Sequence, residues 1–219
     1  MWPVHHLNDS AEALHHAVLP AERGVWVMTP TRSAIVLGSS QKDGDVDMEF
    51  CRDAGIDVVR RRSGGGAVYV HPTQSLWIDV VIARGDPLWC DDIGESMWWL
   101  GEQFGESLAE AGLGELLVHR TAPVRNEWSN ALCFAGIGSG EVVDIGTSGV
   151  PRKVVGISQR RTRDFARFQC IIYGEWNAPL HCKILPILQS DPGRVEVLVA
   201  TVDPEHLGFE YLSPQLLGF

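Results

Sequence analysis

The sequence predicts an α+β fold in which a mixed β-sheet is packed by helices. Short β-type segments outnumber helical ones along the 219 residues. The clearest strand is 75–82, where every second residue from Leu76 to Ile82 is a large aliphatic one. Helices near residues 10–19 and 91–112 are expected to cover the sheet. A chain of this length can bury one sizeable core. With no internal repeat or linker evident, a single domain over 1–219 is predicted.

The other elements follow from capping, turn and breaker residues. Asp9 and Ser10 can cap a helix with Ala11, Leu14 and Val18 on one face, ended by Pro20. Acidic Asp91 and Asp92 would open the longer helix, where they suit its dipole. A short helix is predicted at 48–55, and strands at 25–28, 34–38, 58–60, 68–70, 115–118, 132–134 and from Lys153 onward.

Composition excludes several classes of function. The formal net charge of -10 argues against nucleic acid as the main partner, since phosphate contacts need a basic surface. A local basic pocket is still possible, with Arg60–Arg62 and Arg160–Arg163 as its candidates. No apolar run approaches the roughly 20 residues of a membrane span. The N-terminus lacks the features of a signal peptide.

The cysteine and histidine residues indicate a protein that works in a reducing compartment and has no metal site. The five cysteines include no CxxC pair, so neither a disulfide framework nor a zinc site is expected. His5, His6, His15 and His16 lack Cys or carboxylate partners at ligand spacing and are interpreted as surface histidines. We therefore predict a cytoplasmic protein.

The most informative stretch runs from Val58 to Val70. Three arginines, Arg60–Arg62, precede the triple glycine Gly64–Gly66, with β-type residues on both sides. This order predicts a strand, a tight glycine-rich turn and a second strand. Glycines without Cβ atoms let a ligand approach the backbone, and the arginines supply positive charge. A hairpin turn with a solvated basic edge explains the same residues.

A second stretch surrounds Lys153. The lysine begins an apolar segment in which Gly156 and Ser158 are small, so its ammonium could reach across a narrow pocket. A compact ammonium can stabilise a developing oxyanion directly. An ordinary surface lysine at the start of a strand is the alternative.

Together these motifs resemble the lipoate–protein ligase family, within the biotin/lipoate ligase and octanoyltransferase superfamily. The first motif is Arg61-Arg62-Ser63-Gly64-Gly65-Gly66-Ala67-Val68-Tyr69, and the second includes Lys153, Gly156 and Ser158. The resemblance implies that the first motif wraps an acyl chain and the phosphate of an acyl-adenylate. It also implies that Lys153 contacts the reacting carbonyl and phosphate. Larger ligases carry a C-terminal accessory domain, for which residues 203–219 are too short.

Departures from the ligase pattern are consistent with a second reaction, acyl transfer through a cysteine. Gln169-Cys170-Ile171 stands where Gln-His-Gly is expected, and the turn at His71–Gln74 is altered. Cys133-Phe134 is similar to the segment that carries the nucleophile in one class of octanoyltransferase. A thiolate there could attack an acyl-carrier thioester without ATP. A buried, inert Cys133 is the alternative, and Cys170 is a weaker nucleophile candidate.

The resemblance therefore implies three functions. The first is an ATP-dependent ligase that converts lipoate and Mg²⁺–ATP to lipoyl-AMP and transfers the acyl group to a lysine. The acceptors would be lipoyl domains of 2-oxoacid dehydrogenase complexes or the glycine cleavage H protein, with a separate accessory protein possible. The second is an octanoyltransferase that uses octanoyl-acyl carrier protein and Cys133. The third is a non-catalytic acyl- or adenylate-binding protein.

Overall fold

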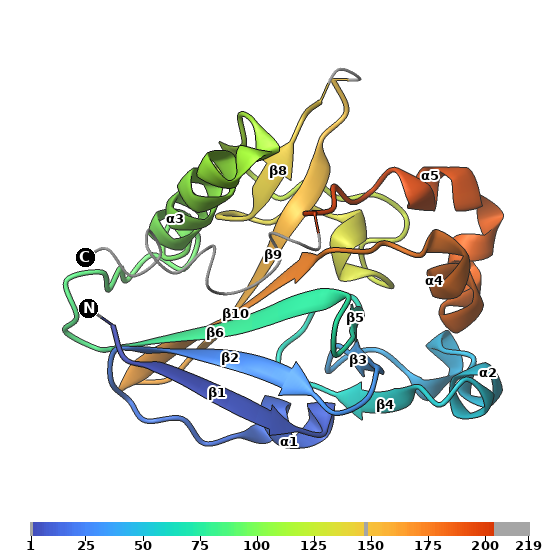
Figure 1. Ribbon diagram of the computed structural model, residues 1–219, viewed down its shortest axis with the longest axis horizontal. Coiled ribbons are helices and arrows are strands. Elements are labelled where there is room, and N and C mark those ends of the chain that lie inside the picture. Colours follow the sequence, from blue (N-terminus) through green and yellow to red (C-terminus); the bar gives the residue numbers. More distant parts are fainter. Residues whose placement is uncertain (1, 147–148, 204–219) are drawn as a thin grey trace.

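A seven-stranded mixed sheet forms the centre of the protein in a computed structural model that describes residues 2–146 and 149–203. Its strand order is β1-β2-β6-β10-β9-β8-β7; β1 pairs with β2 in parallel and the other neighbours are antiparallel. The strands are β1 (Val4–Asp9), β2 (Gly24–Pro30), β6 (Ser75–Ala83), β10 (Phe165–Tyr173), β9 (Arg152–Arg161), β8 (Val142–Asp144) and β7 (Leu117–Val118). Figure 1 shows the long central strands crossing the molecule.

A second sheet has three strands in the order β4-β3-β5: β4 (Asp57–Arg60), β3 (Ala34–Leu37) and β5 (Val68–Val70). The helices are α1 (Ala11–His16), α2 (Met48–Asp53), α3 (Trp98–Leu108), α4 (Ala178–Ile184) and α5 (Pro192–Glu196). Short 3₁₀ turns occur at Asp43–Asp45, Cys133–Ala135 and Pro186–Ser190, and a π-helical turn, Ala109–Leu113, follows α3. The α+β prediction with a mixed sheet is confirmed.

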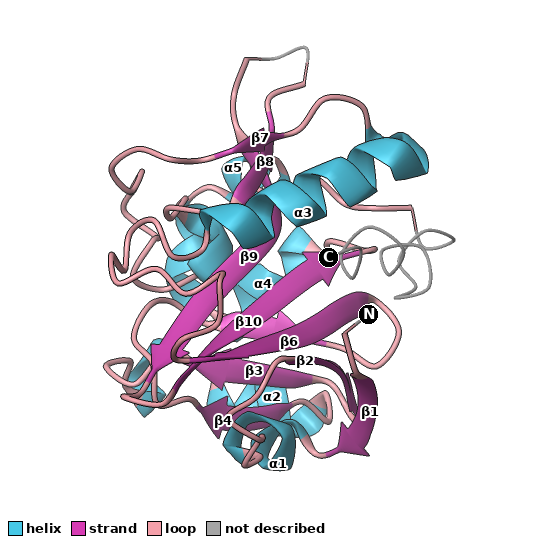
Figure 2. Cartoon of the chain, turned by 90° about the vertical axis from the view of Figure 1, so that its left-hand side faces the viewer, coloured by secondary structure: helices cyan, strands magenta, loops and turns pink. Residues whose placement is uncertain are grey.

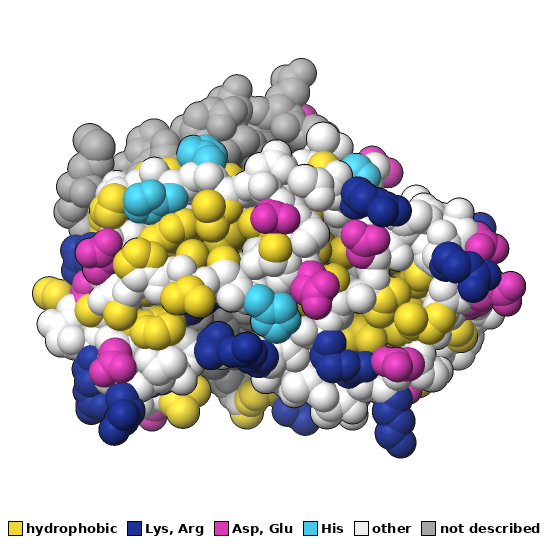
Figure 3. Space-filling view, turned by 90° about the horizontal axis from the view of Figure 1, so that it is seen from below, with side chains coloured by type: hydrophobic (Ala, Val, Ile, Leu, Met, Phe, Trp, Pro, Cys, Tyr) yellow, Lys and Arg dark blue, Asp and Glu magenta, His cyan; other side chains and the backbone are white. Residues whose placement is uncertain are grey.

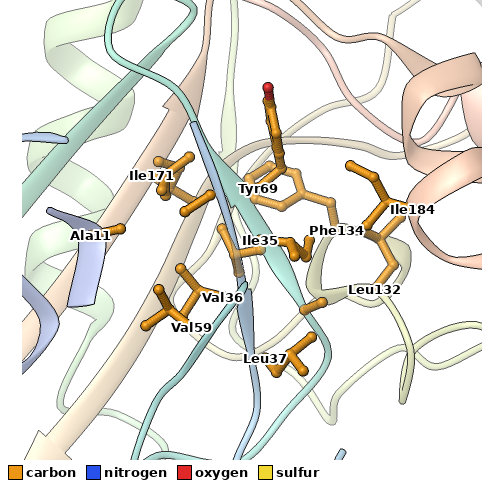
Figure 4. Packing of buried hydrophobic residues seen from close by; sticks show 14 of the residues in the cluster. Ala11, Ile35, Val36, Leu37, Val59, Tyr69, Leu132, Phe134, Ile171 and Ile184 are labelled. Carbon is orange, nitrogen blue, oxygen red and sulfur yellow. The ribbon is translucent and has the colours of Figure 1, made fainter. Parts of the chain in front are cut away.

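Both faces of the large sheet are buried. Helix α3 covers one face, where it lies against β7, β8 and β9 (Figure 2), and Leu100, Phe104 and Leu108 belong to the core on this face. The small sheet and α1, α2 and α4 cover the other face, so β6 is buried along almost its whole length. Figure 4 shows this second core, with β3 residues such as Ile35 facing Tyr69 and Phe134. A pocket between the two sheets therefore has walls of both.

Helix boundaries follow local capping, with two differences from the sequence prediction. Ser10 Oγ accepts a hydrogen bond from Ala13 N, as expected, but α1 ends at His16 and leaves Val18 98% exposed. The longer helix begins at Trp98, not at Asp91. Asp92 Oδ1 instead accepts from the backbone N–H groups of Gly94 and Glu95, a local turn that competes with helix formation.

The glycine-rich segment is not a tight hairpin turn, because β4 and β5 do not pair with each other. Strand β3 lies between them, parallel to β4 and antiparallel to β5. Residues 61–67 must therefore cross the end of β3, which needs a longer connection than a two-residue turn. The prediction of two flanking strands is right, and the predicted turn is wrong.

Surface charge is mixed on the side of the molecule that carries α1, β1 and β4. Lys and Arg side chains alternate there with Asp and Glu side chains around apolar areas (Figure 3). Among the described residues, no helix combines the length and the apolar character that crossing a membrane requires.

Candidate acyl-binding site

Loop 61–67 is held by its own arginine. Arg61 is 6% exposed, and its Nη2 donates to the carbonyl oxygens of Gly64 at 2.8 Å and Gly66 at 3.0 Å. Gly65 has φ 97°, and a Cβ atom on Gly38, at the end of β3, would overlap the Gly65 carbonyl oxygen. Glycine is thus needed at both positions. Arg61 therefore shapes the loop.

The loop docks on the segment that carries Cys133. Ala67 N donates to Ala131 O at 2.8 Å, and Cys133 N donates to Ala67 O at 2.9 Å. A Cβ atom on Gly66 would lie 2.5 Å from Leu132 C and 2.7 Å from Cys133 N. The third glycine therefore allows two backbones to touch. This contact joins the glycine motif to the segment that carries Cys133.

Cys133–Ala135 forms a 3₁₀ turn, so the strand predicted at 132–134 is wrong. Leu132 alone makes a β-bridge, with Ala67, and Ala135 N then donates back to Leu132 O. The turn brings the Phe134 ring against Gly156, where a Cβ atom would lie 3.0 Å from the ring. Cys133 remains only half-buried and lines the pocket.

Lys153 lies directly behind Cys133. Its position at the start of β9 is confirmed, but the side chain is only 2% exposed. Nζ donates to Cys133 O at 2.8 Å and is 2.7 Å from Glu141 Oε2. The Glu141 carboxylate also accepts from Gly138 N at 2.6 Å and Ile157 N at 3.2 Å. Glu141 was missed from the sequence; an acidic residue beside the apolar pair Val142-Val143 was the available signal.

The pocket measures about 380 Å³ with its open mouth included, and it brings part of the predicted site together. The predicted residues that line it are Arg61, Val68, Cys133, Gly156, Ser158 and Cys170. The sequence analysis missed further lining residues: His15, Val70, Trp77, Ile157, Gln169 and Ile171. Their signal was weak because each is an ordinary residue of a helix or strand.

Other predicted site residues, Lys153 among them, lie outside this lining. Tyr69 is buried, and its carbonyl oxygen accepts from the Tyr173 hydroxyl at 2.7 Å. Arg62 and Gly64 are exposed on the loop, and Ser63 is half-buried. The second arginine cluster is distant: Arg161, at the end of β9, stacks on Trp89 with its Cζ 4.2 Å from the ring centroid. Of the two clusters, only Arg60–Arg62 contributes to the pocket, through Arg61.

The two candidate cysteines differ in environment. Cys170 is 1% exposed, and burial, together with nearby Asp79 and Glu141, raises the pKa of its thiol well above the ordinary value. A thiol that stays protonated is a poor nucleophile. Cys133 is the more accessible of the two, and Lys153 places a cation beside it.

His15 also lines the pocket and is half-buried, so it is not the surface histidine predicted. Its ring centroid lies 4.7 Å from that of Trp77, and its Nδ1 lies 3.3 Å from Gln169 Nε2. Burial, and secondarily the charges of Arg61 and Arg167, lowers the pKa of His15 to about 3. The imidazole is therefore neutral at physiological pH.

The protein family follows from the sequence comparison. The chain belongs to the family described as the lipoyl protein ligase A/B catalytic domain, whose match spans residues 9–178. The chain is 28% identical over 130 residues to octanoyltransferase LipM of Clostridioides difficile strain 630. That match covers 59% of this chain and 45% of LipM, so it spans less than half of that relative.

Solved structures agree on the fold. The chain is similar to a bi-partite lipoate protein ligase from Thermoplasma acidophilum, with TM-score 0.67 and 16% identity, covering 100% of this chain and 82% of that one. It is also similar to a lipoate-protein ligase A bound with ATP, with TM-score 0.68 and 15% identity, covering 99% and 83%.

Proposed function

We propose that the protein is an acyltransferase that passes an octanoyl group from acyl carrier protein through Cys133 to a lysine of a lipoyl domain. The observation that carries this is Cys133 itself: its half-buried side chain lines the pocket. A nucleophile must be reachable by its substrate, and the buried Cys170 is not. The 28% identity to an octanoyltransferase supports the same reaction.

The reaction has two balanced steps. The Cys133 thiolate attacks the thioester carbonyl, and the carrier's thiolate leaves, which makes an acyl-enzyme. The amine of the acceptor lysine then attacks this new thioester, and the Cys133 thiol is released as the amide forms. Neither step consumes ATP.

Lys153 is assigned to the oxyanion that forms at the acyl carbonyl in both steps. An ammonium has three donors, of which Glu141 and Cys133 O occupy two. The third can donate to an oxygen bound next to the Cys133 sulfur. Glu141 balances the buried charge, so Lys153 is held in place before substrate arrives.

The ATP-dependent ligase is the second candidate, and the open side of the glycine loop favours it. A Cβ atom on Gly64 would meet nothing within 4 Å, so a phosphate could approach the loop backbone. The carboxylate of lipoate would attack the α-phosphate of ATP, releasing pyrophosphate; Mg²⁺ would enter with the ATP phosphates. The acceptor would again be a lipoyl domain or the H protein, and a separate protein would supply the accessory function.

Intact mass of a lipoyl domain separates these functions. We would incubate it with the protein and either octanoyl-acyl carrier protein alone or lipoate with Mg²⁺–ATP. We expect an octanoyl gain without ATP, and an octanoyl group on the enzyme that Cys133→Ala abolishes. Cys90→Ala, at a half-buried cysteine away from the pocket, is the matched control and should retain activity. A lipoyl gain only with ATP, unaffected by Cys133→Ala, would establish the ligase instead. No gain with either donor, but binding of the acyl group, would leave a non-catalytic binder.

A further inference from the structure

A segment that follows α5 is built into the large sheet beside Lys153. The ladder between β9 and β10 ends at Val155, two residues short of Lys153. The Lys153 backbone instead pairs with residues 198–202: Lys153 N donates to Leu198 O at 2.9 Å, and Ala200 N donates to Lys153 O at 3.0 Å. Figure 1 shows this segment, in red, returning from α5 to β9. Segment 198–202 thus takes the place of β10 beside the lysine.

Segment 198–202 has the side-chain alternation of a β-strand. Val199 forms a parallel β-bridge with Lys153 and packs in the core between the two sheets. Ala200 and Val202 pack in the other core, which α3 covers. The three side chains are 5%, 8% and 1% exposed. Because successive side chains point to opposite faces of a strand, the segment behaves as part of the sheet and not as a passing loop.

Both ends of this segment are anchored by hydrogen bonds. On the α5 side, Trp176 Nε1 donates at 2.9 Å to the carbonyl oxygen of Val195, a fully buried residue of that helix. At the other end, Val202 N donates at 2.9 Å to the carbonyl oxygen of Tyr173, the last residue of β10. A segment that is buried and held at both ends has little freedom to shift. It can therefore fix the backbone of the residue with which it pairs.

The position of the Lys153 backbone determines where its ammonium can reach. Nζ lies 2.8 Å from Cys133 O and 2.7 Å from Glu141 Oε2. These two partners hold the ammonium, while segment 198–202 holds the main chain at the other end of the same side chain. A displacement of about 1 Å near the reacting atoms can lower a rate on the order of 100-fold. Lys153 therefore needs both attachments to stay in place.

We propose that segment 198–202 positions Lys153 for acyl transfer, so that the working site extends beyond the part of the chain that matches the family. That match ends at residue 178, before the segment begins. The segment acts through the Lys153 backbone, because none of its residues lines the pocket around Cys133. The role of Lys153 at the acyl carbonyl rests on the proposed function, whereas its attachment to the segment does not.

The test uses two variants of the segment in the full chain. Ala200→Pro removes the N–H group that donates to Lys153 O, and it should slow formation of the octanoyl-enzyme on the order of 100-fold. Val199→Ala keeps both backbone hydrogen bonds but loosens the packing, and should slow the reaction roughly threefold to tenfold, because a smaller displacement costs less. Val25→Ala, at a valine of β2 that is 2% exposed, is the matched control and should leave the rate unchanged. Intact mass of the protein over time, with saturating octanoyl-acyl carrier protein, measures the rate.

A double-mutant cycle with Lys153→Ala separates positioning from a purely structural role. Without the ammonium nothing is left to misplace, so neither Val199→Ala nor Ala200→Pro should slow the Lys153→Ala protein further. Equal slowing with and without Lys153 would overturn the proposal, and so would equal rates in Val199→Ala and Val25→Ala. Val199→Ala carries the test if Ala200→Pro does not fold.

Hydrogen exchange gives a readout that needs no acyl transfer. The amide of Lys153 should exchange slowly in the wild type and in Val25→Ala, and roughly tenfold faster in Val199→Ala, where the segment opens more easily. Fast exchange at Lys153 in the wild type would contradict the attachment. A wild type that forms no octanoyl-enzyme but lipoylates its acceptor with ATP would disprove the proposed function alone, and the same cycle then applies to that reaction.

Discussion

The two walls of the pocket are built by different means. The wall at loop 61–67 is made of backbone: glycines permit close approach, and Arg61 binds two loop carbonyls. The wall at α1 is made of side chains, in which Asp79, Arg167, Gln169 and His15 form one connected set. The first wall depends on the absence of atoms, the second on the presence of specific partners. Substitutions should therefore affect them differently.

The largest expected effect is on the side-chain wall. Arg167→Met leaves Asp79 buried without its cation and removes the partner of three α1 carbonyls. Losing one member of a buried pair costs about 3–5 kcal/mol. We expect the free energy of unfolding in urea to fall by that amount. Arg52→Met, in an exposed pair with Glu49, should change it by less than about 0.5 kcal/mol. Equal losses in the two variants would show that the Arg167 wall is not a buried network.

A single methyl group added to the backbone wall should lower the rate of acyl transfer. Gly66→Ala places a Cβ atom against the backbone of Leu132 and Cys133, which cannot rotate away. The loop and Cys133 must move apart, and a displacement of about 1 Å can cost on the order of 100-fold in rate. Acyl transfer to a lipoyl domain measures this.

Gly64→Ala is the matched control for that experiment, because its added Cβ atom would meet nothing within 4 Å and its φ is not positive. It should fold and turn over like the wild type. Similar activity in Gly64→Ala and Gly66→Ala would contradict the contact between the loop and the Cys133 segment.

A smaller effect is expected on the pH dependence of stability, through two buried histidines. Burial lowers the pKa of His15 to about 3 and that of His181, in the aromatic core near Tyr69, to about 4. Below about pH 6.5 the unfolded chain binds protons that the folded protein does not, so stability is complete above that pH and declines toward pH 4. His181→Phe should reduce this decline by on the order of 2–3 kcal/mol. A decline as steep in His181→Phe as in the wild type would refute the buried, neutral His181.

Much of the first wall could be predicted from the sequence because its requirements are local. The φ of 97° at Gly65 and the backbone contact at Gly66 each demand glycine, and these two positions are adjacent. The position of Lys153 at the start of a strand was predictable for the same reason, since the strand and its small residues are continuous in the chain. The connection through residues 61–67 was misjudged, because nothing local indicates that β3 lies between β4 and β5.

The sequence by itself determined the α+β class, the glycine motif, Lys153 and the presence of Cys133 before an aromatic residue. Only the tertiary structure decided that, of the two cysteines at the pocket, Cys133 is half-buried and Cys170 is buried, and that Glu141 pairs with Lys153. It also decided that His15 is a neutral pocket residue. The physical reason is that burial and charge partners arise from segments far apart in the chain, such as α1 and β10, which meet only in the folded sheet.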